Sequence, residues 1–310
     1  MEIHQLKYFA TVAETGSFSR AAERCSIAQP SLSQQIIKLE QELGQPLFHR
    51  LGRRVILTDA GQLLLPQAKA ILAELQDIRQ NLAQSLGDGY GTITAGFIPT
   101  VAPFVLPQVI RAFRMAFPHA NIIVHEDMTD ALVRDLVSGK LDVGFMSLPI
   151  HNKMIKTQEL LTEPLLVASS RRDGPFSSYA SIRVNELDDH PFIALSEMHC
   201  LGEQVKAFCF QHEVDLKIVC HASQLGTVHS CVALGLGISL VPQALAVSDP
   251  LADVIYQPLS DIVPRRKIVA ATRSGRKSSF LVKEFTRLVR EEYPTERVLA
   301  VAAYENISHG

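Results

Sequence analysis

The chain has 310 residues, a formal net charge of −2 and 47% hydrophobic residues, so it is long enough to bury two or three hydrophobic cores. Lys7 and Glu14 interrupt the apolar residues at the N-terminus, and no apolar run approaches the length of a membrane span. These features argue against a secreted or membrane protein. We therefore expect a cytoplasmic protein of more than one domain with no membrane contact.

A helix-turn-helix pattern lies near the start of the chain. Ser17 can cap a first helix, and the inward face of that helix carries small side chains: Ala21, Ala22 and Cys25. After a short turn, one apolar stripe runs along a second helix: Leu32, Ile36, Leu39 and Leu43. Two helices with this spacing can cross closely. An ordinary helical hairpin would give the same pattern.

The other face of the second helix carries side chains suited to DNA. These candidate DNA-binding residues are Gln29, Pro30, Ser33, Gln34 and Lys38. Glutamine can make two hydrogen bonds to a base edge, serine can donate or accept, and a lysine can reach a phosphate. The sequence therefore predicts a polar face that reads bases.

Residues 45–58 read as two short apolar strands around a basic turn at Gly52. Such a β wing would place Arg50 and Arg53 beside the reading helix, where they suit backbone or minor-groove contact. With these segments in register, residues 1–61 resemble the winged helix-turn-helix of LysR-type transcriptional regulators. The matching segments are 18–22, 29–33, 47–48, Arg50 and 57–61. Ala28 stands where that family usually has Ser or Thr as a helix cap.

The DNA-binding domain, residues 1–58, is only mildly basic. It has seven Lys or Arg against five Glu, a net charge of +2. Because nonspecific DNA affinity comes largely from phosphate neutralisation, we expect the chain to bind double-stranded DNA as an oligomer. The resemblance also implies a homodimer or homotetramer and contact with RNA polymerase.

A long helix is predicted to follow at residues 59–87 and to serve as a linker and dimerisation helix. Its apolar residues alternate in steps of four and three, like a heptad seam: Leu64, Ala68, Ile71, Leu75, Ile78 and Leu82. We expect Pro66 to kink this helix and residues 88–91 to form a hinge. Packing of the seam on its own domain is the alternative.

Strands and helices alternate from residue 92 to the end of the chain, which predicts parallel sheets with crossover helices. Residues 139–144 and 235–242 match recurring segments of LysR-type effector domains. That resemblance implies an α/β domain like periplasmic solute-binding proteins, with a ligand cleft between two subdomains. The effector domain would span 92–303, with subdomain I at 92–163 and 267–303 and subdomain II at 164–266.

The five cysteines, an odd number, do not suggest a disulfide framework in a reducing compartment. Cys25, Cys220 and Cys231 are interpreted as buried free thiols. Cys200 differs, because it stands at a predicted helix N-terminus beside His199, and both features favour the reactive thiolate. His199 with Cys200 and Cys209 offers only three metal ligands at unusual spacing, so no metal is expected.

The spacing of Cys200 and Cys209 suggests a switch. If the segment between them is helical, their α-carbons lie about 13 Å apart, whereas a disulfide needs about 4.4 to 6.8 Å. Disulfide formation would therefore require the helix to unwind. Thiol oxidation coupled to refolding is one way to build a two-state element.

Around these residues the chain resembles the OxyR group of peroxide-sensing LysR-type regulators. The matching residues are 96–100, 128–132, 199–201, Gln204 and 208–210. The resemblance implies that Cys200 is the peroxidatic cysteine and Cys209 its resolving partner. It also implies that Thr100, Thr129 and His199 help bind and polarise hydrogen peroxide, the effector, and that Arg266 lies close enough to stabilise the thiolate or to orient the segment.

Each position also has a structural explanation. Thr100 and Thr129 could cap helices, Arg266 could pair with a surface carboxylate, and His199 could be a hydrogen-bonded structural residue. Gly202 and Glu203 stand where OxyR proteins commonly carry Arg and Asp. This departure bears on peroxide sensitivity and on the proton donor to the leaving hydroxyl.

The sequence therefore predicts an α/β protein with an N-terminal winged helix-turn-helix, a linker helix and a two-subdomain effector domain. We expect a homotetrameric, cofactor-free activator of transcription that responds to peroxide and is not an enzyme. A LysR-type regulator responding to a small metabolite is the first alternative. A thiol peroxidase is the second, and it would leave residues 1–61 without a role.

Overall fold

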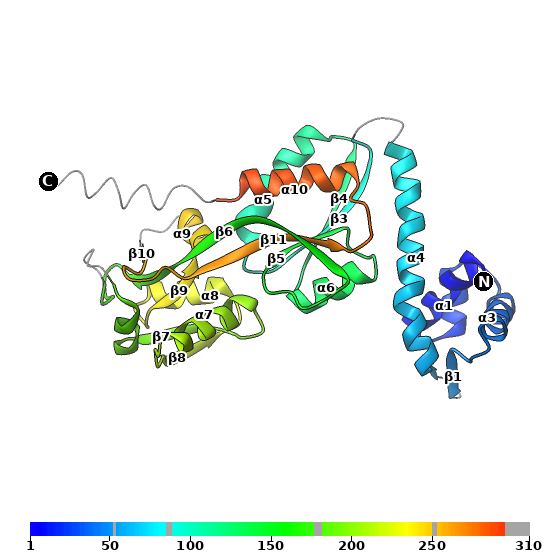
Figure 1. Ribbon diagram of the computed structural model, residues 1–310, viewed down its shortest axis with the longest axis horizontal. Helices are drawn as coiled ribbons and strands as arrows, with labels where there is room; N and C mark the ends of the chain where they lie inside the picture. Colours follow the sequence, from blue (N-terminus) through cyan, green and yellow to red (C-terminus); the bar gives the residue numbers. More distant parts are fainter. Residues whose placement is uncertain (52–53, 85–88, 177–181, 250–252, 295–310) are drawn as a thin grey trace.

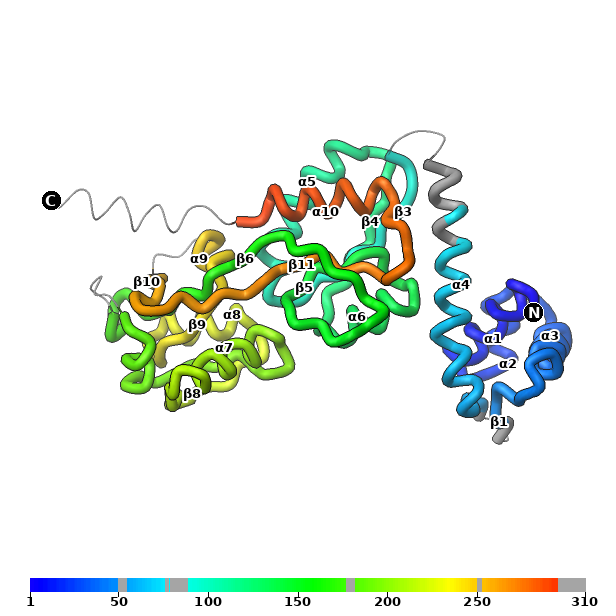
Figure 2. The backbone as a smooth tube through the Cα atoms, viewed as in Figure 1, coloured from blue at the N-terminus to red at the C-terminus, as the bar shows by residue number. Residues whose placement is uncertain are grey.

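A computed structural model describes residues 1–51, 54–84, 89–176, 182–249 and 253–294. The chain folds into an N-terminal helical domain, one long helix and a two-part α/β domain (Figure 1). The backbone trace in Figure 2 shows the long helix standing between the other two parts. No helix among the described residues is long and apolar enough to cross a membrane.

The N-terminal domain is the predicted winged helix-turn-helix. Its elements are α1 (Ile3–Thr15), α2 (Phe18–Arg24), α3 (Gln29–Leu43), β1 (Phe48–Leu51) and β2 (Arg54–Leu57). The Ser17 side chain accepts a hydrogen bond from the Arg20 amide and caps α2, whereas Ala28 gives α3 no side-chain cap. The wing strands β1 and β2 pair antiparallel.

The predicted apolar stripe of α3 is confirmed at three of its four positions. Leu32, Ile36 and Leu39 are fully buried in a core that also contains Phe9. Leu43 is 39% exposed, so its prediction was wrong. It is the last residue of α3, and Gly44 turns the chain away there in the left-handed conformation.

The long helix is α4 (Asp59–Gln84), which continues through Pro66. Ala68 is completely buried in the N-terminal core, and Leu64 packs against that core. The first part of the predicted seam therefore packs on the N-terminal domain of the same chain, which is the alternative to a dimer contact. Further along, Ile71 is 39% exposed and Ile78 is 51% exposed. The side chain of Leu82 and the hinge residue Asp88 lie outside the described residues.

The first part of the α/β domain consists of β3 (Gly91–Phe97), α5 (Ala102–Ala116), β4 (Ala120–Glu126), α6 (Thr129–Val137) and β5 (Val143–Ser147). The long strand β6 (Ile155–Ser170) leads into the second part: a 3-10 helix (Val184–Asp189), β7 (Pro191–Leu195), α7 (Cys200–Gln211), β8 (Lys217–Ala222), α8 (Leu225–Ala233), β9 (Ser239–Pro242), α9 (Gln243–Ser248) and β10 (Val254–Gln257). Finally, β11 (Arg265–Arg273) and α10 (Phe280–Glu292) return to the first part.

The sheets are mixed, so the prediction of parallel sheets was only partly right. Strand β3 pairs parallel with β4 and β5, and β7 pairs parallel with β8. Strand β6, however, pairs antiparallel with β9, β10 and β11. The reason is that β6 carries the chain from the first part to the second and β11 carries it back, so the two strands run in opposite directions (Figure 1).

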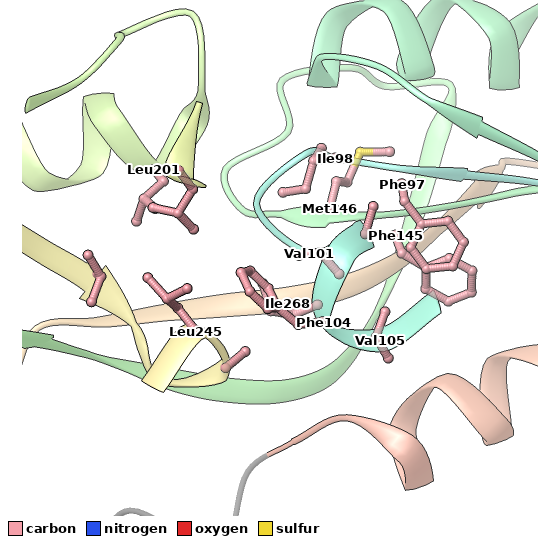
Figure 3. Packing of buried hydrophobic residues seen from close by; sticks show 14 of the residues in the cluster. Phe97, Ile98, Val101, Phe104, Val105, Phe145, Met146, Leu201, Leu245 and Ile268 are labelled. Carbon is pink, nitrogen blue, oxygen red and sulfur yellow. The ribbon is translucent and has the colours of Figure 1, made fainter. Parts of the chain in front are cut away.

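One apolar core runs through both parts of this domain. In the first part, Phe97 and Phe145 stack with ring centroids 4.6 Å apart, and the ring of Phe285 lies edge-on to Phe97 and tilted to Phe145, at 6.3 and 5.8 Å. Figure 3 shows Leu201 and Leu245, from the second part, facing the region of Ile268 and Phe104. The crossing point of the chain is therefore well packed, and the side chains described next lie around it.

Candidate redox site and DNA-binding face

The start of α7 is held tightly against the end of β7. His199 is the residue before the helix, and Cys200 is its first residue. A Cβ atom at Gly202 would lie 2.5 Å from the Ser196 carbonyl oxygen and 2.6 Å from that of Leu195. Only glycine fits there, because backbone atoms cannot move aside. The glycine therefore fixes where Cys200 sits, and a larger side chain at position 202 would displace the helix start.

Groups from both parts of the α/β domain act on the Cys200 thiol. The positive charge of Arg266 and hydrogen bonding by the Thr129 hydroxyl and by the backbone amides of Leu201 and Ser147 all lower its pKa. Thr129 begins α6 and Ser147 ends β5, both in the first part, while Cys200 belongs to the second. The thiol thus lies at the junction of the two parts.

Burial raises the pKa of the Cys200 thiol above its ordinary value and outweighs the opposing effects of Arg266, Thr129 and the two amides. The expectation that the surroundings favour the thiolate was therefore wrong in its net direction. The helix terminus and the cation do act as expected, but removal of the sulfur from water has the larger effect.

Gln204, one turn further along α7, also joins the two parts. Its side-chain nitrogen donates to the Ser147 hydroxyl at 2.9 Å and to the Leu148 carbonyl. Its oxygen Oε1 is buried and has no hydrogen-bond partner among the described residues. A buried acceptor without a partner destabilises the folded protein unless a ligand donates a hydrogen bond to it. The site can thus accept a small hydrogen-bond donor beside Ser147 and Cys200.

Arg266 occupies the centre of a buried polar cluster. It donates to Glu163 Oε2 at 2.7 Å, to the Thr100 hydroxyl at 2.8 Å and to the Thr100 carbonyl at 3.0 Å. Tyr293 donates to the same Glu163 oxygen at 3.0 Å, and the Ala244 amide donates to Glu163 Oε1. Arg266 and Glu163 are 2% and 1% exposed. The pair faces each other across β11 and β6, where the chain crosses between parts.

The structure contradicts three of the simpler explanations, those for Arg266, Thr100 and Thr129. Arg266 pairs with a buried carboxylate and not with a surface one. The residues before α5 and α6 are Val101 and Met128, and neither helix start has a side-chain cap. The hydroxyl of Thr100 instead accepts a hydrogen bond from Arg266, and hydrogen bonding by the Thr129 hydroxyl lowers the pKa of Cys200.

His199 fits its structural explanation. The ring is buried, and Nε2 lies 2.8 Å from the Ser223 carbonyl oxygen, at the end of β8. This hydrogen bond ties the start of α7 to the neighbouring strand. A role of His199 toward peroxide stays a prediction.

Cys209 lies near the other end of α7 and is 2% exposed in the apolar core. Burial, with a smaller effect from Asp188, raises the pKa of its thiol to about 11. The segment between Cys200 and Cys209 is continuous helix, so the two α-carbons lie about 13 Å apart. All five cysteines are free thiols in the described structure.

The remaining cysteines are less deeply buried than expected. Cys25, Cys220 and Cys231 are each half-buried, and the last two pack against the edge of the large core. The Cys25 thiol donates to the Thr11 hydroxyl at 3.6 Å. Across the described residues, no group of three or more His, Cys, Asp or Glu side chains is placed to hold a metal ion.

The predicted DNA-reading face of α3 is open. Gln29, Pro30, Gln34 and Lys38 are exposed, and Ser33 is half-buried. Arg50 lies in wing strand β1, although its side chain is not among the described ones, and Arg53 lies outside the described residues. The reading helix thus presents polar side chains beside the wing.

Sequence reasoning missed Glu163, Tyr293 and Ser147. One signal for Glu163 was available: it is the single carboxylate in the largely apolar run from Leu160 to Val167. A charge in such a run predicts a buried partner. The identity of that partner, more than one hundred residues away, could not be read from the strand itself.

Two family models together match nearly the whole described chain. Residues 3–62 match the bacterial regulatory helix-turn-helix protein, lysR family, and residues 87–294 match the LysR substrate binding domain.

Curated relatives match over almost their full length. The DNA-binding transcriptional dual regulator OxyR of Escherichia coli is 35% identical over 276 residues, which cover 89% of this chain and 90% of the relative. The Hca operon transcriptional activator HcaR of the same organism is 32% identical over 293 residues, or 94% of this chain and 98% of the relative. Among solved structures, a full-length OxyR variant of Pseudomonas aeruginosa has a TM-score of 0.75 at 31% identity and covers 94% of both chains.

Proposed function

Because this chain belongs to the LysR family of bacterial transcriptional regulators, we propose that it senses hydrogen peroxide through Cys200 and Cys209 and changes its contacts with DNA in response. The observation that carries the proposal is the set of groups around the Cys200 sulfur. A hydroxyl, two amides and a buried arginine converge on one thiol at the junction of two subdomains. The relatives named for peroxide-inducible genes support the same effector.

The chemistry uses the groups already described. The Cys200 thiolate attacks one oxygen of hydrogen peroxide, the O–O bond breaks, and the other oxygen leaves as water after protonation. Cys200 is then a sulfenic acid. The Cys209 thiol attacks that sulfur, a second water leaves, and a disulfide remains. In sum, two thiols and one hydrogen peroxide give one disulfide and two waters.

Thr129 and Thr100 have separate roles in this proposal. Thr129 donates to the reacting sulfur and can hold peroxide against it. Thr100 holds the guanidinium of Arg266, whose positive charge stabilises the thiolate. The unpartnered Gln204 oxygen can accept a hydrogen bond from the peroxide O–H. His199 anchors the start of α7 through Ser223.

Disulfide formation must break up α7. Its two cysteines lie about 13 Å apart along the helix, and a disulfide requires about 4.4 to 6.8 Å between α-carbons. The contacts of Cys200 and Gln204 with Ser147 and Thr129 are those that hold α7 to the first subdomain. Unwinding α7 therefore releases one subdomain from the other, which alters how subunits pack together.

Double-stranded DNA is the proposed partner of the open α3 face and the wing, with Gln29, Pro30, Ser33, Gln34, Lys38, Arg50 and Arg53 as the contacting residues. A homodimer or homotetramer would supply the phosphate contacts that one mildly basic domain lacks. RNA polymerase is the proposed partner of the DNA-bound form.

The proposal is tested with Cys200→Ser and, as matched control, Cys25→Ser. A DNA duplex is first selected from a random pool by the reduced protein, and footprints are then compared before and after one equivalent of peroxide. We expect the footprint of the wild type and of the Cys25 variant to change. The Cys200 variant should bind the same duplex with a footprint that peroxide does not alter.

The alternatives give different outcomes in this experiment. A footprint that changes in the Cys200 variant as well would contradict the peroxide mechanism, and a metabolite-responsive regulator with a ligand in the same cleft would then be the better account. A thiol peroxidase would consume many equivalents of peroxide per chain with a reductant present, and its activity would not require the DNA-binding domain.

A further inference from the structure

A recess lies between helix α10 and the paired strands β6 and β11 in the first part of the α/β domain (Figure 1). Its floor includes two register pairs of these strands, Lys156 with Thr272 and Gln158 with Ala270, and α10 forms a wall. The recess has a volume of about 560 Å³, which is the size of a small-molecule site. None of the described residues that line it is a cysteine, so the recess is separate from the redox site.

The charged side chains that line this recess in the described structure are all cations. They come from the start of β6, from the loop before α10 and from α10 itself: Lys156, Arg276, Lys277, Lys283, Arg287 and Arg290. A concave site lined by charges of one sign concentrates ligands of the opposite sign. The lining therefore favours an anionic ligand.

Carboxylates compensate only part of this charge. Asp142 pairs with Arg276, and Glu284 and Glu291 pair with Arg287. The other four cations, Lys156, Lys277, Lys283 and Arg290, form no ion pair with a carboxylate of the described chain. The recess thus keeps an excess of positive charge that a ligand can neutralise.

Arg290 is held in place before any ligand binds. Its Nη2 donates to the Glu159 carbonyl oxygen at 3.1 Å, which ties α10 to β6. The guanidinium has further N–H groups that can donate to a ligand. Because its side chain is already ordered, binding through Arg290 costs less conformational entropy than binding through a free side chain.

We propose that this recess binds a small ligand that carries a chain of two or more phosphate groups. Lys283, Arg287 and Arg290 follow one another at steps of four and three residues, so they form a row about 10 Å long on one side of α10. A row of that length suits a chain of phosphates better than a single anion. Each phosphate offers several acceptor oxygens, which match a lining of ammonium and guanidinium donors.

Two kinds of compound supply this chemistry, a nucleoside triphosphate and an inorganic polyphosphate. A DNA duplex presents its phosphates on a convex surface, which a recess of this volume cannot enclose. The bound ligand would join α10 to the start of β6, whichever of the two compounds supplies it. This gives the regulator a second ligand that does not depend on the oxidation of Cys200.

The test measures binding of tripolyphosphate to the reduced full-length protein by isothermal titration calorimetry at low salt. Lys156→Ala removes an exposed cation from the strand, and Lys283→Ala removes one from the helix. Each variant should bind tripolyphosphate about tenfold more weakly than the wild type, because one charged donor is lost. Thermal unfolding without ligand should be the same in both variants as in the wild type, since neither lysine is paired.

The matched control is Lys217→Ala, which removes an exposed lysine from β8, outside the recess. It should bind tripolyphosphate like the wild type. The Cys200→Ser variant should also bind like the wild type, so a failure of the peroxide-sensing proposal leaves this result intact. Higher salt should weaken binding in every variant, because the attraction is electrostatic.

A second titration, with adenosine triphosphate, distinguishes the two sources of the phosphates. Tighter binding than that of tripolyphosphate would identify a nucleotide as the ligand, and equal or weaker binding would identify an inorganic chain. In both cases the affinity should fall in the Lys156 and Lys283 variants.

Three results would overturn the proposal. Tripolyphosphate could bind the two lysine variants as tightly as it binds the wild type. Citrate could bind the wild type as tightly as tripolyphosphate does, which would mean a general attraction of anions. Alternatively, the lysine variants could lose affinity for duplex DNA and keep their affinity for tripolyphosphate, which would assign these lysines to a nucleic-acid contact.

Discussion

Arg266 is a buried charge whose removal has a predictable cost. It is held by Glu163 and Thr100, and both members of the ion pair are almost completely buried. Replacing Arg266 by Gln leaves the Glu163 carboxylate without its cation, so the free energy of unfolding should fall by about 3 to 5 kcal/mol. Urea denaturation measures this loss.

The neighbouring residue provides the control. Arg265 lies on the same strand but is exposed, and Arg265→Gln should change the unfolding free energy by no more than about 0.5 kcal/mol. Adding Glu163→Gln to the Arg266 variant should recover part of the stability, because the orphaned charge is gone. Equal losses in the Arg265 and Arg266 variants would contradict the buried-pair account.

The reactivity of Cys200 should depend on pH in a direction that its surroundings fix. Burial raises the pKa of this thiol, so at pH 7 the thiol form predominates and the thiolate fraction grows with pH. We expect the rate of its reaction with one equivalent of peroxide to rise steadily from pH 6 to pH 9. Stopped-flow trapping of the sulfenic acid measures the rate. A rate that is constant over this range would mean a lowered pKa and would show that Arg266 outweighs burial.

Helix α7 depends on a close approach at Gly202. Because the Cβ of an alanine there would meet two carbonyl oxygens of the β7–α7 connection, Gly202→Ala should lower the unfolding free energy by about 1 to 3 kcal/mol. Gly226, in helix α8, has open space around its Cβ position. Gly226→Ala should instead stabilise the protein by about 0.5 to 1 kcal/mol. Thermal unfolding of both variants tests the contact, and a stable Gly202 variant would refute it.

The elements themselves were largely predictable from periodicity. The positions of Leu32, Ile36 and Leu39 identified α3, and the buried run at 141–146 identified β5. The prediction that Leu43 is buried was wrong because periodicity does not say where a core ends. The prediction of parallel strands around β6 was wrong for a related reason. Local alternation of strands and helices does not reveal that β6 and β11 carry the chain out and back between the subdomains.

The site was predictable only in part. Thr129 and Arg266 both act on the pKa of Cys200, but the pattern of residues near Cys200 could not reveal that burial would dominate that pKa. Glu163 and Tyr293 join the cluster from strand β6 and from the end of α10. Contacts between segments so far apart in the sequence follow from the fold and not from local spacing.

At the scale of the whole molecule, α4 is the element with an exposed apolar face. Ile71 and Ile78 are seven residues apart, so they lie on one side of the helix, and both are exposed in the single chain. We expect this face to meet a second copy of α4. Replacing both isoleucines by Glu should shift the oligomer toward smaller species in sedimentation experiments at micromolar concentration.

The matched control is Gln62→Glu, which adds charge to an exposed position on the opposite side of the same helix from Ile71. It should leave the sedimentation profile unchanged. If the isoleucine variant sediments like the wild type, the contact between subunits lies elsewhere.

The most direct measurement is a peptide map of the full-length protein before and after one equivalent of peroxide. Trypsin places Cys200 in peptide 184–206 and Cys209 in peptide 207–217, so a disulfide between them joins two otherwise separate peptides. We expect this joined species to appear first, while Cys25 in peptide 25–38 stays alkylated. A Cys200 that remains alkylated, or that links to any cysteine other than Cys209, would contradict peroxide sensing through a Cys200–Cys209 disulfide.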